Sequence, residues 1–283
     1  MEYLTGYTIK PHQITAIGEV RFTDGTNTDL GANQVTCEAY GHTYDKTSGT
    51  CRAFRYNTNL NRNISNINNS LNGTGNTTEV GSNTVQINGT RNTARGFNNN
   101  CFINGSVNEI DNSINDSTVI GGKMGRALRQ GEVVLGGGSF NTVAGGTQSS
   151  KIQLSTKTTD ATPKNLGVQD IPDAFITLQI NSIVGYEIYI TRLETGGTSG
   201  IAGDYSYRNQ RGVVKTDSSG TISIITHSTK TIGKVGVNGT FSVVDSTTSG
   251  IPSITIQATD RASVNNLWSA TIYLHELATG IDF

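Results

Sequence analysis

Five stretches of the chain share one pattern: NINNSLNG (66–73), SNTVQING (82–89), NNNCFING (98–105), INDSTVIG (114–121) and QGEVVLGG (130–137). Each stretch begins sixteen positions after the one before it and carries an aliphatic residue two positions before a glycine. The aliphatic residues are Leu71, Ile87, Ile103, Val119 and Leu135, and the glycines are Gly73, Gly89, Gly105, Gly121 and Gly137. Five such triplets at a constant period indicate a repeat, even in a chain with 34 Gly.

The repeat predicts a parallel β-roll in which each period forms one coil. The aliphatic residue of each coil points inward from a short strand, and the glycine lies where the chain turns or takes a positive φ. Asn tolerates left-handed conformations and suits the remaining corners. Each coil buries only one or two aliphatic side chains, so the thin core favours an oligomer that buries further apolar surface between chains. The alternative is a low-complexity Asn/Gly linker.

The composition of the 283 residues excludes several classes of protein. The charged share is 15%. The hydrophobic share is 34%, which lies below the ~45–50% usual for a globular chain. A net charge of -1 gives no electrostatic signal for nucleic acid or an anionic membrane. No run approaches the ~18 apolar residues of a membrane span, and the N-terminus does not resemble a secretory signal. We therefore expect neither nucleic-acid binding nor membrane insertion.

Three zones of composition predict three regions in an all-β chain. Residues 1–56 are mixed, and 57–147 are rich first in Asn and then in Gly; 15 of the 28 Asn residues lie between 57 and 100. Residues 151–283 contain alternating apolar and polar runs that are separated by Gly-containing turns, which is typical of an antiparallel sandwich or jelly roll. The expected strands are 174–180, 184–193, 221–226, 240–244, 254–258 and 267–277.

The repeats at 82–89, 116–122 and 131–146 resemble the head repeats of trimeric autotransporter adhesins. Such repeats also occur in bacteriophage fibres, where they form a left-handed β-roll in a parallel homotrimer. The resemblance covers about residues 70–147 and implies a trimeric β-roll stalk. The chain has neither a signal peptide nor a C-terminal membrane-barrel segment, so a phage origin is expected.

The C-terminal zone resembles a second phage module. The segments 184–192, 205–208 and 212–215 resemble its first half, and 253–258 and 267–276 resemble its closing strands. This module commonly ends phage tail-fibre and other virion proteins, often directly after Gly-rich trimeric repeats. The resemblance implies a fibre or spike whose N-terminal region, residues 1–56, docks on the virion, with the 57–147 stalk projecting a head at 151–283.

One cluster is the best candidate for binding a glycan on the host surface: Tyr205, Tyr207, Arg208, Asn209 and Arg211. Exposed aromatic rings stack on sugars, and amides and charged groups bond their hydroxyls. Tyr205 and Tyr207 are two residues apart, so they share a face of a strand. The alternative is that this face packs inside the sandwich or between protomers.

The cysteines and histidines do not predict a metal site. Cys37, His42 and Cys51 have no fourth ligand nearby, as a structural zinc site requires, so a loop or hairpin with free thiols is favoured. Pairing of Cys37 with Cys51 on oxidation is the alternative. Cys101 occupies the position of Val85 in its repeat and is predicted to be a small core residue. No cofactor and no metal are expected. His275 and Trp268 are predicted to be structural residues of the last strand.

Catalytic motifs are missing from the sequence. Glu109 and Asp111 alternate onto one side of an expected strand, with Asp116 nearby, and a pair of carboxylates is what cleavage of a polysaccharide requires. Nothing distinguishes them from Glu79 or Glu132, so solvated roll surface is favoured. The sequence therefore predicts a protein that is not an enzyme.

The combined prediction is a homotrimeric phage tail fibre, assembled in the bacterial cytoplasm and carried on the virion. Its partners would be itself, another virion protein at the N-terminal region, and a glycan or protein of the host surface. Several weak sites per trimer would bind through avidity. Two alternatives stay open: a capsid head fibre or decoration protein that stabilises the shell, and a tailspike that degrades polysaccharide.

Overall fold

The structure is a computed structural model that describes Gly6 and residues 8–53, 68–140, 144–168, 171 and 175–279. The chain divides into two compact units, Met1–Leu60 and Asn61–Phe283. The predicted boundary after residue 56 lies outside the described residues. The prediction of an all-β chain is confirmed, since α1 is the one α-helix in the described ranges. None of the helical structure described is long and apolar enough to span a membrane.

The N-terminal unit consists of two antiparallel hairpins, β1–β2 and β3–β4, and a short helix. Its elements are β1 (Lys10–Ile14), β2 (Val20–Thr23), α1 (Gln34–Ala39), β3 (Thr43–Asp45) and β4 (Thr50–Arg52). The helix begins after Asn33, whose side chain accepts a hydrogen bond from the Thr36 N–H at 2.9 Å. Such a side-chain acceptor satisfies one of the free N–H groups at a helix start.

A disulfide joins Cys37 of α1 to Cys51 of β4. The prediction of free thiols is therefore wrong. The helix and the hairpin bring the two Cα atoms to 5.6 Å, within the range that a disulfide spans, and residue spacing alone could not show this. Both cysteines are buried beside Val20 and Phe22 in a small core. A cross-link stabilises so small a unit by restricting its unfolded chain.

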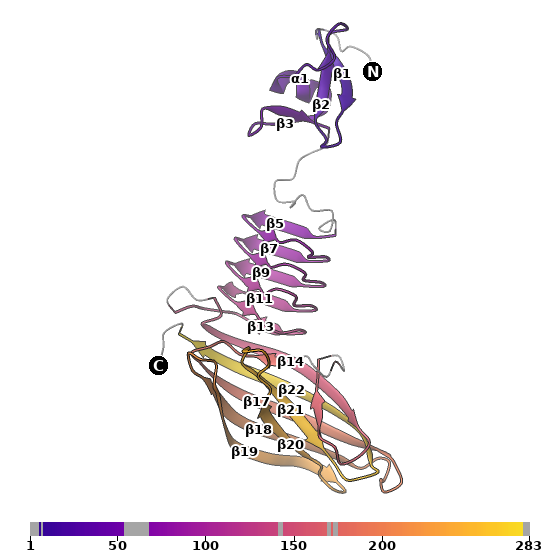
Figure 1. Cartoon of the computed structure of the whole chain (residues 1–283), viewed down its shortest axis with the longest axis vertical. Helices are drawn as coiled ribbons and strands as arrows, with labels where there is room; N and C mark the ends of the chain where they lie inside the picture. The colour runs from indigo at the N-terminus through magenta and orange to yellow at the C-terminus, as the bar shows by residue number, and fades with distance from the viewer. Residues whose placement is uncertain are drawn as a thin grey trace. The chain divides into compact units, whose positions relative to one another are not determined.

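The second unit begins with a β-solenoid of about four turns, as the sequence repeat predicted. Figure 1 shows its strands stacked coil upon coil. One column of parallel strands is β5 (Ser70–Thr74), β7 (Gln86–Thr90), β9 (Phe102–Ser106), β11 (Thr118–Lys123) and β13 (Val133–Leu135). A second is β6 (Thr77–Thr78), β8 (Thr93–Ala94), β10 (Glu109–Ile110) and β12 (Arg126–Ala127). Isolated bridges connect Asn83, Asn99 and Asn115 as a third parallel contact.

Three corners recur in the coils, and each places a residue in the left-handed region. The non-glycine residues with positive φ at these corners are Thr84, Asn100 and Asp116 at one corner, Arg91, Val107 and Met124 at the second, and Phe97 and Ser113 at the third. Only one of these eight is Asn, so the prediction that Asn serves the corners is largely wrong. Asn76, Asn92 and Asn108, which repeat at the same period, lie inside the solenoid instead.

A column of buried asparagines runs through the solenoid interior. The Asn92 amide donates to Asn76 Oδ1 at 3.1 Å, and the Asn108 backbone N–H donates to Asn92 Oδ1 at 2.9 Å. Beside this column lie the apolar residues of the coils, among them Ile87 and Ile103. The amides bond coil to coil where an aliphatic side chain would leave backbone groups unpaired.

Cys101 is buried among the apolar residues of the coils, as predicted. Its neighbours in the core include Val85 and Ile103. Burial raises the pKa of its thiol to about 11. The side chain therefore serves as a small core residue and is not a reactive thiolate at neutral pH.

The repeat glycines permit the close stacking of the coils. Gly73, Gly89 and Gly105 have positive φ and lie in register across β5, β7 and β9. A Cβ on Gly89 would lie 1.9 Å from the Gly105 carbonyl oxygen. Gly121 also has a positive φ. Gly137 does not, but a Cβ there would lie 2.4 Å from the Gly125 Cα.

The fifth repeat is out of step by one residue. Glu109 pairs with Arg126, one position beyond the regular spacing, whereas Val119 pairs with Val134, one position short of it. Val134 therefore takes the inward position and is fully buried, while Leu135, which was predicted to point inward, is 49% exposed. One extra residue at Gly122 lengthens the spacing between β10 and β12, and the next coil is one residue shorter, which shortens the spacing between β11 and β13.

The solenoid column continues directly into the C-terminal part of the chain. β13 pairs with β14 (Thr147–Thr158), which pairs with β22 (Asn265–Ala278) along its whole length. The sheet then runs on through β17 (Ser182–Gly196), β18 (Tyr205–Thr216) and β19 (Ile222–Val235). The described residues thus form one ten-stranded sheet from β5 to β19, here called the large sheet. The predicted division between stalk and head at 147–151 falls at the start of β14.

A second sheet shares a core with the C-terminal strands of the large sheet. Its strands are β15 (Lys164–Leu166), β16 (Ile176–Thr177), β20 (Thr240–Asp245) and β21 (Ser253–Thr259). Trp268, Ile188 and Ile256 are among the buried residues between the sheets. Trp268 is thus a core residue, as predicted. The strand expected at 174–180 reduces to β16 in the described residues, and β14 was not predicted.

A buried group of charged side chains joins the solenoid to β22. Arg129 donates to Glu132 at 2.5 Å and to Glu276 of β22 at 2.7 Å. All three side chains are at most 1% exposed. Burial raises the pKa of Glu132. Burial also acts to raise the pKa of Glu276, but the charge and hydrogen bonds of Arg129 outweigh it, and the pKa of Glu276 is lowered. Glu132 stands in the row where Val85, Cys101 and Ser117 stand in earlier coils, so this row changes from apolar to polar and then to charged along the solenoid.

Candidate functional site

The outer face of the large sheet, opposite the shared core, carries the candidate site. Glu187 of β17 is in register with Tyr273 of β22 on one side and Arg211 of β18 on the other. In the next row, Tyr189 is in register with Thr271 and Asn209. Residues in register on neighbouring strands share a face and lie about 5 Å apart. The rows therefore bring residues that are distant in the sequence into one patch.

These side chains surround an open hollow of about 450 Å³. Its lining residues are Glu187, Tyr189, Tyr207, Thr271, Tyr273 and His275. They come from three adjacent strands, so a rigid hydrogen-bonded framework fixes their spacing.

Glu187 is the acceptor at the centre of the hollow. Tyr189 Oη donates to its Oε1 at 2.8 Å, Arg211 Nη2 at 2.6 Å and Asn209 Nδ2 at 3.2 Å. The hydrogen bond from Tyr189 and the guanidinium of Arg211 hold the pKa of Glu187 below its ordinary value. The same contact raises the pKa of Tyr189. Glu187 is therefore an ionised carboxylate at neutral pH.

The three tyrosines present ring faces and edges in different directions. The Tyr189 and Tyr207 rings stack with centroids 6.2 Å apart and an angle of 27° between their planes. The Tyr273 ring meets Tyr189 edge-on at the same centroid distance, with an angle of 90°. Lys151 lies over the Tyr273 ring at 6.0 Å. The hollow thus offers flat apolar surface next to charged hydrogen-bonding groups, a combination that suits the apolar faces and hydroxyl groups of sugars.

The structure places four of the five predicted binding residues on this face. Tyr205 is 43% and Tyr207 37% exposed, so the alternative that these side chains are packed inside the sheets does not hold for this chain. Tyr207 lines the hollow, and Asn209 and Arg211 bond Glu187. Arg208 was placed in the cluster wrongly. It points to the opposite face, where it is buried and lies 4.5 Å from the centre of the Phe241 ring.

Sequence reasoning missed most residues of the hollow, among them Glu187, Tyr189, Tyr273 and His275. His275 was predicted to be structural, but it is exposed at the edge of the hollow. The alternation in β17 and β22 does show which residues share a face. The order of the strands was the missing information, because β22 lies between β14 and β17 in the sheet and not next to β21.

A second concave site, here called the junction cleft, lies where the solenoid meets the C-terminal part of the chain. It is a cleft of about 340 Å³ that is lined by Asp111, Arg126, Leu128, residues 177–180 and Ala278. Arg126 donates to Asp111 at 2.9 Å and lies 4.0 Å from Glu109, which also accepts from Arg95 at 2.9 Å. The two carboxylates that the sequence analysis assigned to solvated surface are thus held around one guanidinium.

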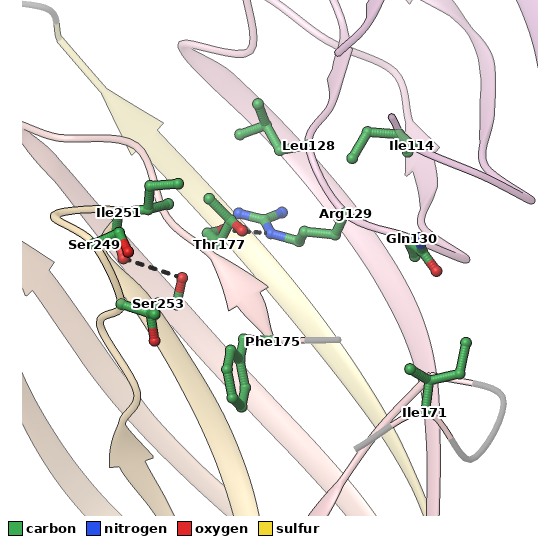
Figure 2. Close-up of a pocket in the computed structure, with 11 residues that line it drawn as sticks. Ile114, Leu128, Arg129, Gln130, Ile171, Phe175, Thr177, Ser249, Ile251 and Ser253 are labelled. Atoms are coloured by element: carbon green, nitrogen blue, oxygen red, sulfur yellow. Dashed lines mark hydrogen bonds between the residues drawn. The ribbon is translucent and has the colours of Figure 1, made fainter. Parts of the chain in front are cut away.

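A third site, drawn in Figure 2, is an apolar groove of about 410 Å³. Leu128, Ile114 and Ile251 point into it, and Arg129 lies at its back. Arg129 Nε donates to the Thr177 carbonyl at 2.6 Å, and its other nitrogens bond Glu132 and Glu276. No free charge therefore faces the groove from Arg129, and the groove is not a candidate for polar chemistry.

The described residues contain no group of three or more His, Cys, Asp or Glu side chains that could hold a metal ion. His42, which the sequence analysis considered with the two cysteines, cannot share a metal with them because they form the disulfide. The expectation that no metal is bound stays a prediction.

Known protein families and curated proteins gave no match to the chain. Among solved structures it is similar to the tailspike protein of Acinetobacter baumannii phage AM24, at 10% identity and a TM-score of 0.27, over 76% of this chain and 51% of that one. It is also similar to the tailspike protein gp49 of Acinetobacter baumannii phage Fri1, described as a capsular polysaccharide depolymerase, at 10% identity and a TM-score of 0.25, over 74% and 48%.

Both of these neighbours are phage tailspikes. The chain spans about half the length of these tailspikes. The prediction of a protein that is not an enzyme is contradicted, because one neighbour is described as a depolymerase. An activity is therefore no longer excluded, and TM-scores below 0.5 do not assign one.

Proposed function

We propose that this protein is a fibre or spike component of a bacteriophage virion, and that the hollow on its outer sheet face binds a polysaccharide of the host surface. The observation that carries the proposal is the ionised Glu187 among three tyrosine rings. A carboxylate accepts hydrogen bonds from sugar hydroxyls, and the rings cover the apolar faces of the sugar. The strands hold both in place without a mobile loop.

The proposal is tested by competition between purified protein and phage particles for host cells. Tyr207→Ala removes a ring of the hollow and is expected to weaken inhibition of adsorption about tenfold, since stacked aromatic contacts are worth about 1 kcal/mol or more beyond the area they bury. Tyr205→Ala is the matched control, because Tyr205 lies on the same face and strand but does not line the hollow. Equal effects of the two substitutions, or no inhibition by the unaltered protein, would refute the assignment.

The protein is further proposed to act as a homotrimer. Large apolar side chains on the solenoid are exposed in the single chain: Val80 by 56%, Phe97 by 64%, Ile120 by 51% and Leu135 by 49%. Contact between protomers would remove such surface from water. Light scattering on a sizing column is expected to give three times 30.1 kDa, or about 90 kDa. A mass near that of one chain would exclude the trimer.

The N-terminal unit is proposed to dock on the particle through residues 1–56. This assignment rests on the resemblance of the later regions to phage fibres. Removal of the unit is expected to abolish incorporation into particles while leaving binding to host cells intact. Incorporation of the shortened chain would place the docking surface elsewhere.

Cleavage of the bound polysaccharide is a second candidate function, and the junction cleft favours it. Glu109 and Asp111 both lie within ion-pair distance of Arg126, so their carboxyl groups are separated by at most about 10 Å, the range that glycosidases use. Shortening of host polysaccharide, followed on a gel, tests the activity. Glu109→Gln and Asp111→Asn should each reduce it at least 100-fold. Full activity in both variants would remove the cleft from consideration.

A further inference from the structure

The outer face of the large sheet is strongly basic, although the chain as a whole is not. The register of the strands places five cations on this face: Lys151 and Lys157 on β14, Arg211 and Lys215 on β18, and Lys230 on β19. On the described strands β14, β17, β18, β19 and β22, Glu187 is the one carboxylate of this face. Five cations and one carboxylate give a formal charge of +4, in a chain whose net charge is -1.

The cations flank the hollow. Lys151, Tyr273, Glu187 and Arg211 follow one another across four adjacent strands. The Arg211 guanidinium is already paired with Glu187. Four steps of about 4.8 Å between strands put Lys151 on β14 and Lys230 on β19 roughly 19 Å apart, on opposite sides of Glu187. In the next row, Lys230 lies beyond Asn209 and Tyr189. A polymer lying across the strands would therefore meet positive charge, then the hollow, then positive charge again.

We propose that the ligand of this face is an acidic polysaccharide whose charged groups are separated by neutral sugar. The inference rests on the proposed function and narrows its substrate class. Acidic groups would lie over Lys151 and Lys230, and an uncharged sugar would place its hydroxyls on Glu187 and its apolar face on the tyrosines. A neutral glycan would leave the flanking cations unused.

The carboxylate at the centre also argues against nucleic acid as the ligand. Tyrosine rings in a basic groove do suit single strands, since bases stack on aromatic side chains. A single strand carries a phosphate at each nucleotide, however, so phosphates would be forced next to the ionised Glu187. Repulsion between like charges at that distance opposes binding.

Binding of hyaluronate, in which a uronate alternates with a neutral sugar, tests the inference. The matched probe is carboxyl-reduced hyaluronate, which has the same backbone without the charges. A third probe, oligothymidylate, represents single-stranded nucleic acid. Calorimetry on the full chain is expected to show at least fivefold tighter binding of hyaluronate than of the reduced polymer, and a loss of affinity as salt increases. Oligothymidylate is expected to bind more weakly than hyaluronate.

Two variants identify the face. Lys151→Gln combined with Lys230→Gln should reduce affinity for hyaluronate about fivefold, at roughly 0.5 kcal/mol for each exposed charge, and should flatten the salt dependence. Lys164→Gln removes the same charge from β15 of the second sheet and should change neither the affinity for hyaluronate nor its salt dependence. Circular dichroism verifies that all three chains are folded.

The outcomes separate this inference from the proposed function. Hyaluronate binding no tighter than that of the reduced polymer, no detectable binding of hyaluronate, or equal losses in the lysine variants and the Lys164 control would overturn the acidic substrate class. The proposed function would survive these results if Tyr207→Ala still weakened adsorption to host cells. Tighter binding of oligothymidylate than of hyaluronate would assign the face to nucleic acid and overturn the inference.

Discussion

The solenoid and the C-terminal sheets solve the same packing problem with different groups. The core described in the solenoid has nine buried residues, none larger than isoleucine, and shares the interior with columns of asparagine. The core between the two C-terminal sheets has nineteen, including Trp268 and Tyr186. The solenoid thus depends on hydrogen bonds between coils, and the sheets depend on buried apolar area. The contrast shows why a chain that is only 34% hydrophobic can still fold.

The largest effect is expected where the two parts meet. Arg129→Met leaves the carboxylates of Glu132 and Glu276 buried without their cation, which should cost about 3–5 kcal/mol of unfolding free energy. Urea unfolding followed by tryptophan fluorescence measures it. The triple variant Arg129→Met, Glu132→Gln and Glu276→Gln should regain most of the loss. A loss below about 1 kcal/mol in the single variant would show that the charges do not join the two parts.

Truncation of one isoleucine in each core tests whether the two cores respond alike. Ile272→Ala and Ile103→Ala both remove a fully buried side chain and should each cost about 2–5 kcal/mol. In the sheets the loss should lower protection from hydrogen exchange throughout the shared core. In the solenoid it should be confined to the coils next to Ile103, because each coil contacts only its neighbours. Uniform loss of protection in both variants would mean that the two parts unfold together.

The buried amide column provides a third test within one coil. Asn92→Ala removes the donor to Asn76 and Gly105 and the acceptor of the Asn108 N–H, so that buried polar groups lose their partners. The expected cost is about 2–3 kcal/mol. Asn88→Ala is the matched control in the same coil, since Asn88 accepts its bond from Asn72 at the surface, and should cost about 0.5 kcal/mol or less. Equal midpoints in thermal unfolding would show that the interior amides are not required.

The smallest effect concerns the pH dependence of binding at the hollow. The pKa of Glu187 is lowered in the folded chain, so binding that uses its ionised form should persist below pH 4.5, the ordinary value, and be lost as the pH falls further. Tyr189→Phe removes the largest cause of that shift, and binding should then be lost at a higher pH than in the unaltered chain. Affinity for the polysaccharide, followed from neutral pH down through this range, measures both profiles. Arg211, Tyr273, Lys151 and His275 also face the hollow but are the same in both chains, so superimposed profiles would contradict the role of Tyr189.

The regular features of the repeat could be predicted because they follow from short-range chemistry. A constant spacing of aliphatic residues and glycines determined the inward positions of Ile87, Ile103 and Val119 correctly. It failed at Leu135, since one inserted residue at Gly122 and one deletion cancel in the count and leave the period apparently intact. The strand β14 was missed because it carries Ser, Thr and Lys at most of its outward positions and only a few aliphatic residues inside.

The site was only half predictable for a similar reason. The alternation within one strand is enough to place Tyr205, Tyr207, Asn209 and Arg211 on one face, and it should also have excluded Arg208, which alternates with them. Glu187 and Tyr273 come from other strands, and their position beside Arg211 depends on the order β18–β17–β22. No local pattern encodes that order.

The short contact between β13 and β14 has a mechanical consequence. Tension that passes from the solenoid into the C-terminal sheets must cross this contact, which has three residue pairs, before it reaches the twelve pairs between β14 and β22. The contact has a quarter of the residue pairs that join β14 to β22, and the bonds of Arg129 to Glu276 run beside it. A chain that is pulled from both ends is therefore expected to separate at this seam before β14 and β22 part, with the outer face of the sheet still folded.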